Sequence, residues 1–321
     1  MRLHTLLHRT AVALPAVSLL GVALPQAASA AFQAPEPLVA EAPMWRDENA
    51  FMRYPFLPVT IRGKAAMLQI DLENEGSLTL STAGLTQLGV TLADTTTRLD
   101  SLGIGPVVER NVSVQLIPDA MPGPPDRPPV VGIAGVELIN HYDVLYDFPK
   151  RRVRLYQGPK QTTTAGAAWL PPEIKLTDCG RRIPLPPGAG TFTGVEMQLD
   201  GHPVAGVLEI APYQDKMNQA AVTAMGLTDS SSRIQPIPDG TLPPGYSHNG
   251  YVITKQVPDV HMTVGSHMFF TGPVQIFPVL DVEERGVVKP HTPVMLMSLS
   301  TIRDVVLFNS VSGGQVCLSK P

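Results

Sequence analysis

Short runs of apolar and alternating residues, separated by turns, fill most of the chain. Between Arg53 and Tyr156, only Thr82 to Leu88 has the spacing of a short helix, with Ser81 or Thr82 as its cap. The 33 prolines and the scarcity of helical windows predict a mainly β protein. The strands expected in the first half are Val59 to Ile61, Ala66 to Ile70, Val112 to Ile117, Val130 to Ala134 and Val144 to Tyr156, the last interrupted by a Phe148-Pro149 turn.

Two stretches of the chain repeat one pattern. Each has an apolar strand, a glycine-containing turn, a second apolar strand that runs into one acid, and an alanine-containing helix-like segment; the acids are Asp71 and Glu209. A later echo pairs the segment from Gly135 with the segment from Leu296. Such an internal duplication predicts two similar lobes that pack as a pseudo-dimer, each with one acid at the shared interface.

The length of 321 residues suits two domains with separate cores. Proline-rich stretches at 121–129 and 235–249 are expected to form exposed loops. The division that the pattern predicts is a signal peptide at 1–30, an extended N-terminal arm at 31–52, a first lobe at 53–156, a linker at 157–190 and a second lobe at 191–321.

The first thirty residues have the features of a secretory signal peptide. Arg2 and Arg9 precede an apolar run at 11–25, and Ala28-Ser29-Ala30 forms a small-residue cleavage site. The apolar run is too short and too interrupted by proline for a membrane span. No cysteine stands near residue 30, so a lipid anchor is not expected. We therefore predict a protein that is periplasmic or secreted.

The chain has two cysteines, Cys179 and Cys317, both in its second half. In an exported protein a lone pair of cysteines favours a disulfide over a reactive thiol. This bond would fasten the start of the second lobe to the C-terminal strand.

Charge and motif content exclude several classes of function. The net charge is −4, and the one basic cluster, Lys150 to Arg152 with Arg154, is interpreted as a solvated hairpin tip, so no nucleic-acid partner is expected. The histidines lack the paired spacing of a zinc site, and no G-x-S-x-G elbow is present. We expect neither a cofactor nor a metal.

Several segments together resemble the aspartic proteases, above all the bacterial retropepsin-like group. The strand that ends in Asp71 and the helix that ends in Leu88-Gly89 resemble its D-T-G-A-S region. The segments 133–139 and 143–148 resemble its I-L-G-L-D-F-L and R-V-x-L-D-F signatures. The likeness covers 54–156 and, more faintly, 191–318. It implies a mainly β, two-lobed, acid-protease-like β-barrel fold built from an internal duplication.

The resemblance also implies a catalytic dyad of Asp71 and Glu209, in which two carboxylates share one proton. The sequence departs from the family at both acids. Leu72 and Ile210 replace the Thr or Ser that fixes the dyad by hydrogen bonds, and Glu73 replaces a glycine. When the segment from Leu296 is aligned with the segment from Gly135, Leu296 stands where the second family signature has its glycine.

These residues lead to three hypotheses. The first is an exported aspartic endopeptidase of the retropepsin-like family, with a worn Asp71/Glu209 dyad that cleaves peptides at acidic pH. The second is a non-catalytic pseudoprotease that binds extended peptides in the cleft between the lobes by strand-like pairing. The third is a dimer that brings two Asp71 side chains together. We expect a peptide or protein ligand, and a monomer in which the lobes form the pseudo-dimer.

Two smaller features leave alternatives open. Asp71 to Gly76 weakly matches the start of a calcium loop, but Thr82 stands where a bidentate acid is needed. Tyr246 and Tyr251 belong either to a mobile flap over the cleft or to a plain surface loop.

Overall fold

A computed structural model describes the chain in segments. These are residues 38–44, 56–71, 76–93, 97–121, 123, 126–157, 169–183, 193–208, 215–242, 247–248, 250–280, 283, 288–289 and 291–321. The expected signal peptide, Glu209 and Tyr246 lie outside the described residues.

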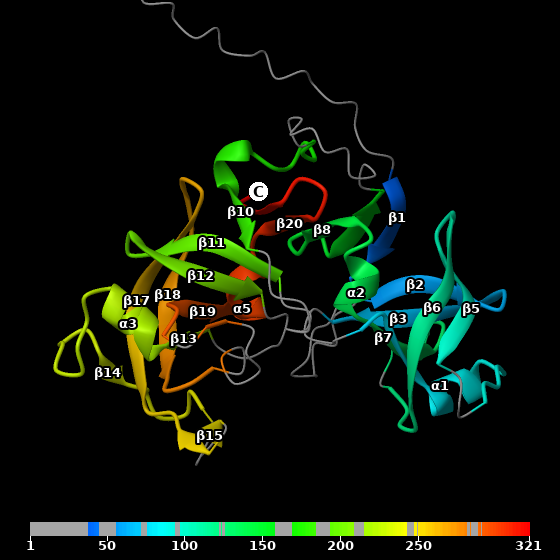
Figure 1. The fold of residues 1–321 in the computed structure, drawn as a ribbon, viewed down its shortest axis with the longest axis horizontal. Helices are drawn as coiled ribbons and strands as arrows, with labels where there is room; N and C mark the ends of the chain where they lie inside the picture. The colour runs from blue at the N-terminus through cyan, green and yellow to red at the C-terminus, as the bar shows by residue number, and fades with distance from the viewer. Residues whose placement is uncertain are drawn as a thin grey trace, which may run out of the picture. The chain divides into compact units, whose positions relative to one another are not determined.

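In the first lobe, six strands close into a barrel in the order β2-β3-β7-β4-β6-β5 (Figure 1). The strands are β2 (Phe56–Ile61), β3 (Lys64–Ile70), β4 (Leu78–Ser81), β5 (Arg98–Ile104), β6 (Val107–Ile117) and β7 (Val130–Ala134). Helix α1 (Thr82–Gln87) follows β4, and α2 (Val136–Ile139) follows β7. The strands expected in this region are confirmed within β2, β3, β6 and β7, and the last one forms the hairpin of β8 (Asp143–Asp147) and β9 (Arg152–Tyr156).

The second lobe repeats this barrel strand for strand. Its order is β11-β12-β19-β13-β18-β17, and a further pairing of β17 with β11 closes the circuit. The strands are β11 (Thr193–Leu199), β12 (His202–Leu208), β13 (Lys216–Asn218), β17 (Lys255–Val264), β18 (His267–Phe277) and β19 (Val294–Met297). Helix α3 (Gln219–Ala224) follows β13, and α5 (Leu299–Ile302) follows β19. Short strands β14 (Gln235–Pro236), β15 (Ser247–His248) and β16 (Tyr251–Val252) occupy the longer loop of this lobe.

The duplication is exact in topology. Each of the six pairings in one barrel has the same parallel or antiparallel sense as its counterpart in the other. The expected fold class, a mainly β, two-lobed, acid-protease-like β-barrel fold built from an internal duplication, is confirmed by this strand order.

A six-stranded antiparallel layer joins the lobes, in the order β1-β9-β8-β20-β21-β10. The remaining strands are β1 (Leu38–Pro43), β10 (Cys179–Ile183), β20 (Val306–Ser310) and β21 (Gln315–Ser319), and a short 3-10 helix, η1 (Leu176–Asp178), precedes β10. Where β8 meets β20, Leu145 pairs with Phe308, and the flanking pairs Val144–Asn309 and Tyr146–Leu307 are related by symmetry. A pseudo-two-fold axis therefore passes through the Leu145–Phe308 pair.

The segments expected as arm and linker, 31–52 and 157–190, contain β1 and β10. These two strands occupy equivalent places at the outer ends of the central layer, because β1 pairs with β9 and β10 pairs with β21. Each repeat therefore begins one strand before the barrel that it builds.

The echo of the second signature is shifted by two residues from its expected register. Helix α2 begins directly after Gly135, and α5 begins directly after Ser298, so Ser298 corresponds to Gly135. Leu296 lies within β19 instead, paired with Lys216 as Ile133 is paired with Thr79. The physical reason is that strand side chains alternate with a period of two, so a slide of two residues leaves the apolar pattern unchanged.

The central layer separates two apolar cores. Tyr146 and Leu307 belong to the large cluster that contains residues of both barrels, and Leu145 and Phe308 belong to a smaller cluster with Trp169 packed on it. This alternation follows from the opposite directions of successive strand side chains. The shared cluster ties the two lobes to one layer.

The helix after the acid-bearing strand is capped in the same way in both lobes. Ser81 accepts a hydrogen bond from the Gly84 backbone N–H at 2.9 Å, which confirms the expected short helix and selects Ser81 as its cap. Asn218 accepts from the Ala221 backbone N–H at 2.9 Å. Such caps satisfy a backbone donor that has no partner within the helix.

Two hairpin turns lie against the strands that begin the repeats, and each depends on a glycine. Gly105 (φ +55°) and Gly265 (φ +60°) adopt left-handed backbone conformations. A Cβ on Gly105 would lie 2.5 Å from the Val39 carbonyl oxygen, and a Cβ on Gly265 would lie 2.5 Å from that of Thr177. Neither turn has room for a side chain.

We therefore expect Gly105→Ala and Gly265→Ala each to lower the free energy of unfolding by about 2–3 kcal/mol, because backbone strain and steric overlap add. Urea unfolding measures this loss. Gly63→Ala is the matched control, since Gly63 also has positive φ (+75°) but its Cβ would meet nothing within 4 Å. Equal losses at Gly63 and Gly105 would contradict the steric argument.

Candidate functional site

Asp71 directly follows β3, at the end of the strand where the sequence analysis placed it. Its backbone N–H donates to the Ala134 carbonyl oxygen, 3.2 Å away, at the end of β7. Its side chain is partly exposed. Glu209 follows directly after β12 in the sequence but lies outside the described residues. The Asp71/Glu209 dyad therefore stays a prediction.

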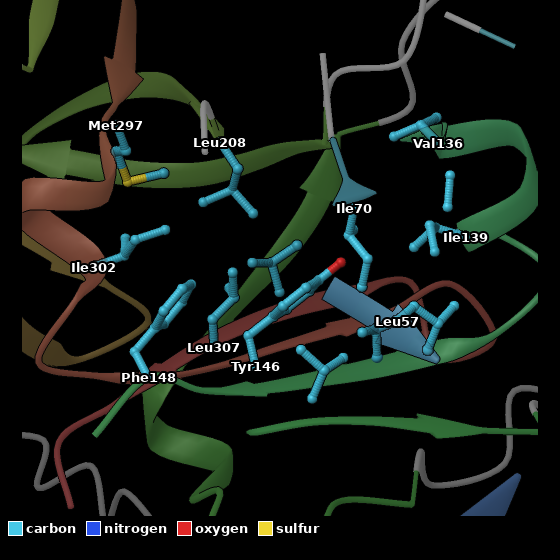
Figure 2. Packing of buried hydrophobic residues seen from close by; sticks show 14 of the residues in the cluster. Leu57, Ile70, Val136, Ile139, Tyr146, Phe148, Leu208, Met297, Ile302 and Leu307 are labelled. Atoms are coloured by element: carbon cyan, nitrogen blue, oxygen red, sulfur yellow. The ribbon is translucent and has the colours of Figure 1, made fainter. Parts of the chain in front are cut away.

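The residues just before the two acids share one buried layer. Ile70 ends β3 and Leu208 ends β12, and both belong to the large apolar cluster. Figure 2 shows Ile70 and Leu208 above the side chains of Tyr146 and Leu307, which come from the central layer. Two equivalent strand ends, each followed by an acid in the sequence, thus rest on the same core.

In the first lobe, main-chain hydrogen bonds hold the two residues that lead into β4. The Gly135 N–H donates to the Ser77 carbonyl oxygen at 3.1 Å, and the Glu137 N–H donates to the Gly76 carbonyl oxygen at 3.2 Å. The entry to β4 is therefore fixed to the start of α2.

In the second lobe, a side chain makes the corresponding connection. Asp215, 2% exposed, precedes β13, and its carboxylate accepts hydrogen bonds from the Ser298 N–H (2.9 Å), the Ser298 hydroxyl (3.2 Å) and the Thr301 hydroxyl. Sequence reasoning missed Asp215. Asp215 stands directly before β13, but the sequence pattern aligns Leu296 with Gly135, two residues away from the true counterpart Ser298. Ser298 was therefore not recognised as the partner of Asp215.

A polar pair lies at the pseudo-two-fold axis beneath these strand ends. Tyr146 is fully buried, its hydroxyl has no hydrogen-bond partner among the described residues, and burial raises the pKa of this phenol well above its usual range. Asn309, its symmetry counterpart, is also fully buried, with Nδ2 3.5 Å from the Thr193 hydroxyl. The Tyr146 phenol therefore stays neutral at every physiological pH.

Outside this region, opposite charges compensate much of the basic cluster of the β8–β9 hairpin. Arg154 contacts Glu41 at 2.9 Å and Glu173 at 2.7 Å, and Arg152 contacts Asp147 at 3.1 Å. The arginines thus connect β9 to β1 and to residue 173, so they are not a purely solvated hairpin tip.

The expected disulfide between Cys179 and Cys317 is confirmed. The two cysteines lie directly opposite each other where β10 pairs with β21. The disulfide fastens β10, the first strand of the second repeat, to β21, the last strand of the chain, as the sequence predicts.

Other features concern binding groups. Within the described segments, no helix is long and apolar enough to cross a membrane, and no group of three His, Cys, Asp or Glu side chains could hold a metal ion. Residues 72–75 of the calcium-like loop lie outside those segments. Tyr251 lies in β16 with its side chain 44% exposed.

No protein-family model matches the chain, and no curated protein matches it. Among solved structures, the fold is similar to the crystal structure of the aspartic proteinase from Irpex lacteus. That similarity covers 88% of this chain and 97% of the other, with a TM-score of 0.47 and 8% sequence identity. A likeness at this level does not bear on activity, so the fold class rests on the strand order and the duplication.

Proposed function

We propose that the protein is an exported, aspartic-protease-like protein that binds extended peptides between its lobes and cleaves them slowly at acidic pH. The observation that supports this most is the repeated placement of an acid. Asp71 and Glu209 each follow the same strand of two topologically identical barrels, and the residues before them share one core. The disulfide supports export, because such bonds persist in oxidising compartments.

The chemistry would use the two acids as a unit. The ionised carboxylate of Asp71 would accept a proton from a water molecule whose oxygen attacks the peptide carbonyl carbon. The protonated Glu209 would donate its proton to the carbonyl oxygen, which gives a tetrahedral diol. Asp71 would then pass the proton that it took from water to the peptide nitrogen as the C–N bond breaks. Glu209 would take back a proton from one diol hydroxyl, so that the products are a carboxylic acid and a neutral amine. This requires one shared proton, so the rate should fall as pH rises and the dyad loses it.

Two features of the sequence argue for a slow reaction. Leu72 and Ile210 cannot make the hydrogen bonds that the family uses to orient its acids, and Glu209 is one methylene longer than aspartate. A misplacement of about 1 Å can cost about a hundredfold in rate.

The test is cleavage of casein and of a peptide library between pH 3 and 7, with and without a pepstatin-type inhibitor. We expect Asp71→Asn and Glu209→Gln each to lower kcat by about 10²–10⁴-fold, because each removes a proton-transfer group. Asp304→Asn, an acid-to-amide change at an exposed residue that follows α5, is the matched control and should leave kcat unchanged.

The outcomes separate the three hypotheses. Loss of cleavage in both amide variants supports the Asp71/Glu209 dyad. Loss in Asp71→Asn alone, with a dimer by native mass spectrometry, supports pairing of two first lobes. The alternative pseudoprotease is supported by the departures at Leu72 and Ile210. It predicts no cleavage but retained peptide binding in both variants.

A further inference from the structure

We propose that Cys179 is a site of thiol–disulfide exchange, at which a small thiol attacks the Cys179–Cys317 bond of the folded protein. The attack is directed at the sulfur of Cys179, and Cys317 is the residue whose sulfur leaves. This chemistry is independent of the peptide cleavage proposed above, because it depends only on how differently the two ends of the disulfide are covered.

The two cysteines differ in burial. Cys317 is fully buried and belongs to the apolar cluster that contains Leu145 and Phe308. Cys179 is partly exposed and packs against this cluster from outside. Exchange requires the incoming thiolate to reach the sulfur that it attacks. Burial therefore closes Cys317 to a thiol from solution and leaves Cys179 as the point of attack.

Cys179 lines an open groove of about 650 Å³ at the side of the second barrel, together with Arg181, Glu196 and Gln198. The side chains of Cys179 and Arg181 lie on the same face of β10, because strand side chains alternate with a period of two. Arg181 contacts Glu196, which also lines the groove, so this face of β10 is the one turned toward the groove. A volume of this size accepts a small organic molecule. The groove therefore gives a small thiol a path to Cys179.

The first repeat shows that the fold does not require a covalent bond at this place. Glu41 pairs with Arg154 between β1 and β9, as Cys179 pairs with Cys317 between β10 and β21. Arg154 and Cys317 are true counterparts, since each stands two residues after the residue that closes its hairpin pairing. Glu41 and Arg154 form an ion pair at 2.9 Å. The same position thus carries a non-covalent link in one repeat and a bond that thiols can open in the other.

The exchange is a displacement at sulfur. The incoming thiolate forms a bond to the Cys179 sulfur while the bond to Cys317 breaks, and Cys317 leaves with the electron pair and takes a proton from water. A second thiol attacks the sulfur of the bound thiol, releases Cys179 as a thiol and leaves as the disulfide of the two small thiols. The leaving thiolate of Cys317 is disfavoured in its apolar cluster, so the exchange is slow.

The test is incubation of the folded wild-type protein with glutathione. Acid quenching, alkylation of free thiols with N-ethylmaleimide and peptide mass spectrometry then locate the adduct. We expect glutathione on Cys179 and N-ethylmaleimide on Cys317 at least about tenfold more often than the reverse, because only Cys179 is accessible. In urea, which exposes both sulfurs, the two adducts should differ by less than about threefold.

A second measurement tests the groove as the path of entry. Gln198→Trp places a large side chain in the groove, and Thr60→Trp is the matched control. Thr60 stands at the equivalent position of the first lobe and is likewise exposed. We expect the rate of glutathione exchange to fall at least about fivefold in Gln198→Trp and to stay at the wild-type value in Thr60→Trp, because access limits the attack.

Three results with wild type would overturn the proposal: an adduct that is equally or mainly on Cys317, no exchange in the folded protein, or a rate that does not rise with glutathione concentration. The last would mean that unfolding precedes every attack. An unchanged rate in Gln198→Trp, shown by circular dichroism to be folded, would overturn it as well. The wild-type adduct decides the proposal even where a tryptophan variant does not fold.

Discussion

Replacing Asn218 by alanine should lower the free energy of unfolding by about 3 kcal/mol. Asn218 is 1% exposed and uses its whole amide. Its Oδ1 accepts from the backbone N–H groups of Ala221 (2.9 Å) and Val294 (3.1 Å), and its Nδ2 donates to Glu283 Oε1 (3.0 Å) and the Thr292 carbonyl oxygen (2.8 Å). Alanine removes a helix cap, worth about 1 kcal/mol, and leaves buried groups unpaired at about 1–3 kcal/mol.

Urea unfolding followed by circular dichroism measures this loss. Ser81→Ala is the matched control, because Ser81 caps the equivalent helix of the first lobe but bonds only the Gly84 N–H and the Asp119 carbonyl oxygen among the described contacts. We expect about 1–2 kcal/mol there. A loss in Asn218→Ala no larger than in Ser81→Ala would show that the bonds to residues 283, 292 and 294 do not stabilise the fold.

The sequence predicted local elements well because their determinants are local. The Ser81 cap, the apolar run at 130–134 and the hairpin around Phe148-Pro149 each depend on residues a few positions apart. The strands β1 and β10 were hidden in segments interpreted as an arm and a linker. Their partners in the central layer, β9 and β21, lie more than a hundred residues away, so no local pattern specifies these pairings. The nearer pairing, of β10 with β11, covers only Arg182–Val195 and Ile183–Gly194.

The same limit applies to the candidate site: residues marked by their sequence neighbours could be predicted, and residues that depend on distant partners could not. Asp71 could be placed at a strand end because the apolar run before it is long and the turn after it is polar. Asp215 could not be recognised, because its partners Ser298 and Thr301 are 83 and 86 residues away. The sequence pattern aligns Leu296 with Gly135, two residues away from the structural counterpart Ser298. Nothing in the sequence therefore marked Ser298 as part of the repeat.

Removing the disulfide should have the largest effect on stability. The bond between Cys179 and Cys317 closes a span of 138 residues. Restriction of the unfolded chain by such a loop stabilises the folded state by about 5 kcal/mol as an upper figure, and strain or residual structure in the unfolded state reduces this. We expect the Cys179→Ser/Cys317→Ser double variant to lose about 3–5 kcal/mol in urea unfolding.

The loss of stability should come from the absence of the disulfide bond and not from the replacement of the two cysteine side chains by serine. Dithiothreitol should therefore lower the urea midpoint of wild type nearly to that of the double variant, and it should leave the double variant unchanged. The β10–β21 pairing continues from the disulfide through Gly180–Val316 and Arg181–Gln315, and its backbone hydrogen bonds do not need the sulfur–sulfur bond, so the reduced protein should still fold. A wild-type midpoint that does not move on complete reduction would mean that these hydrogen bonds alone hold the two ends of the second repeat together.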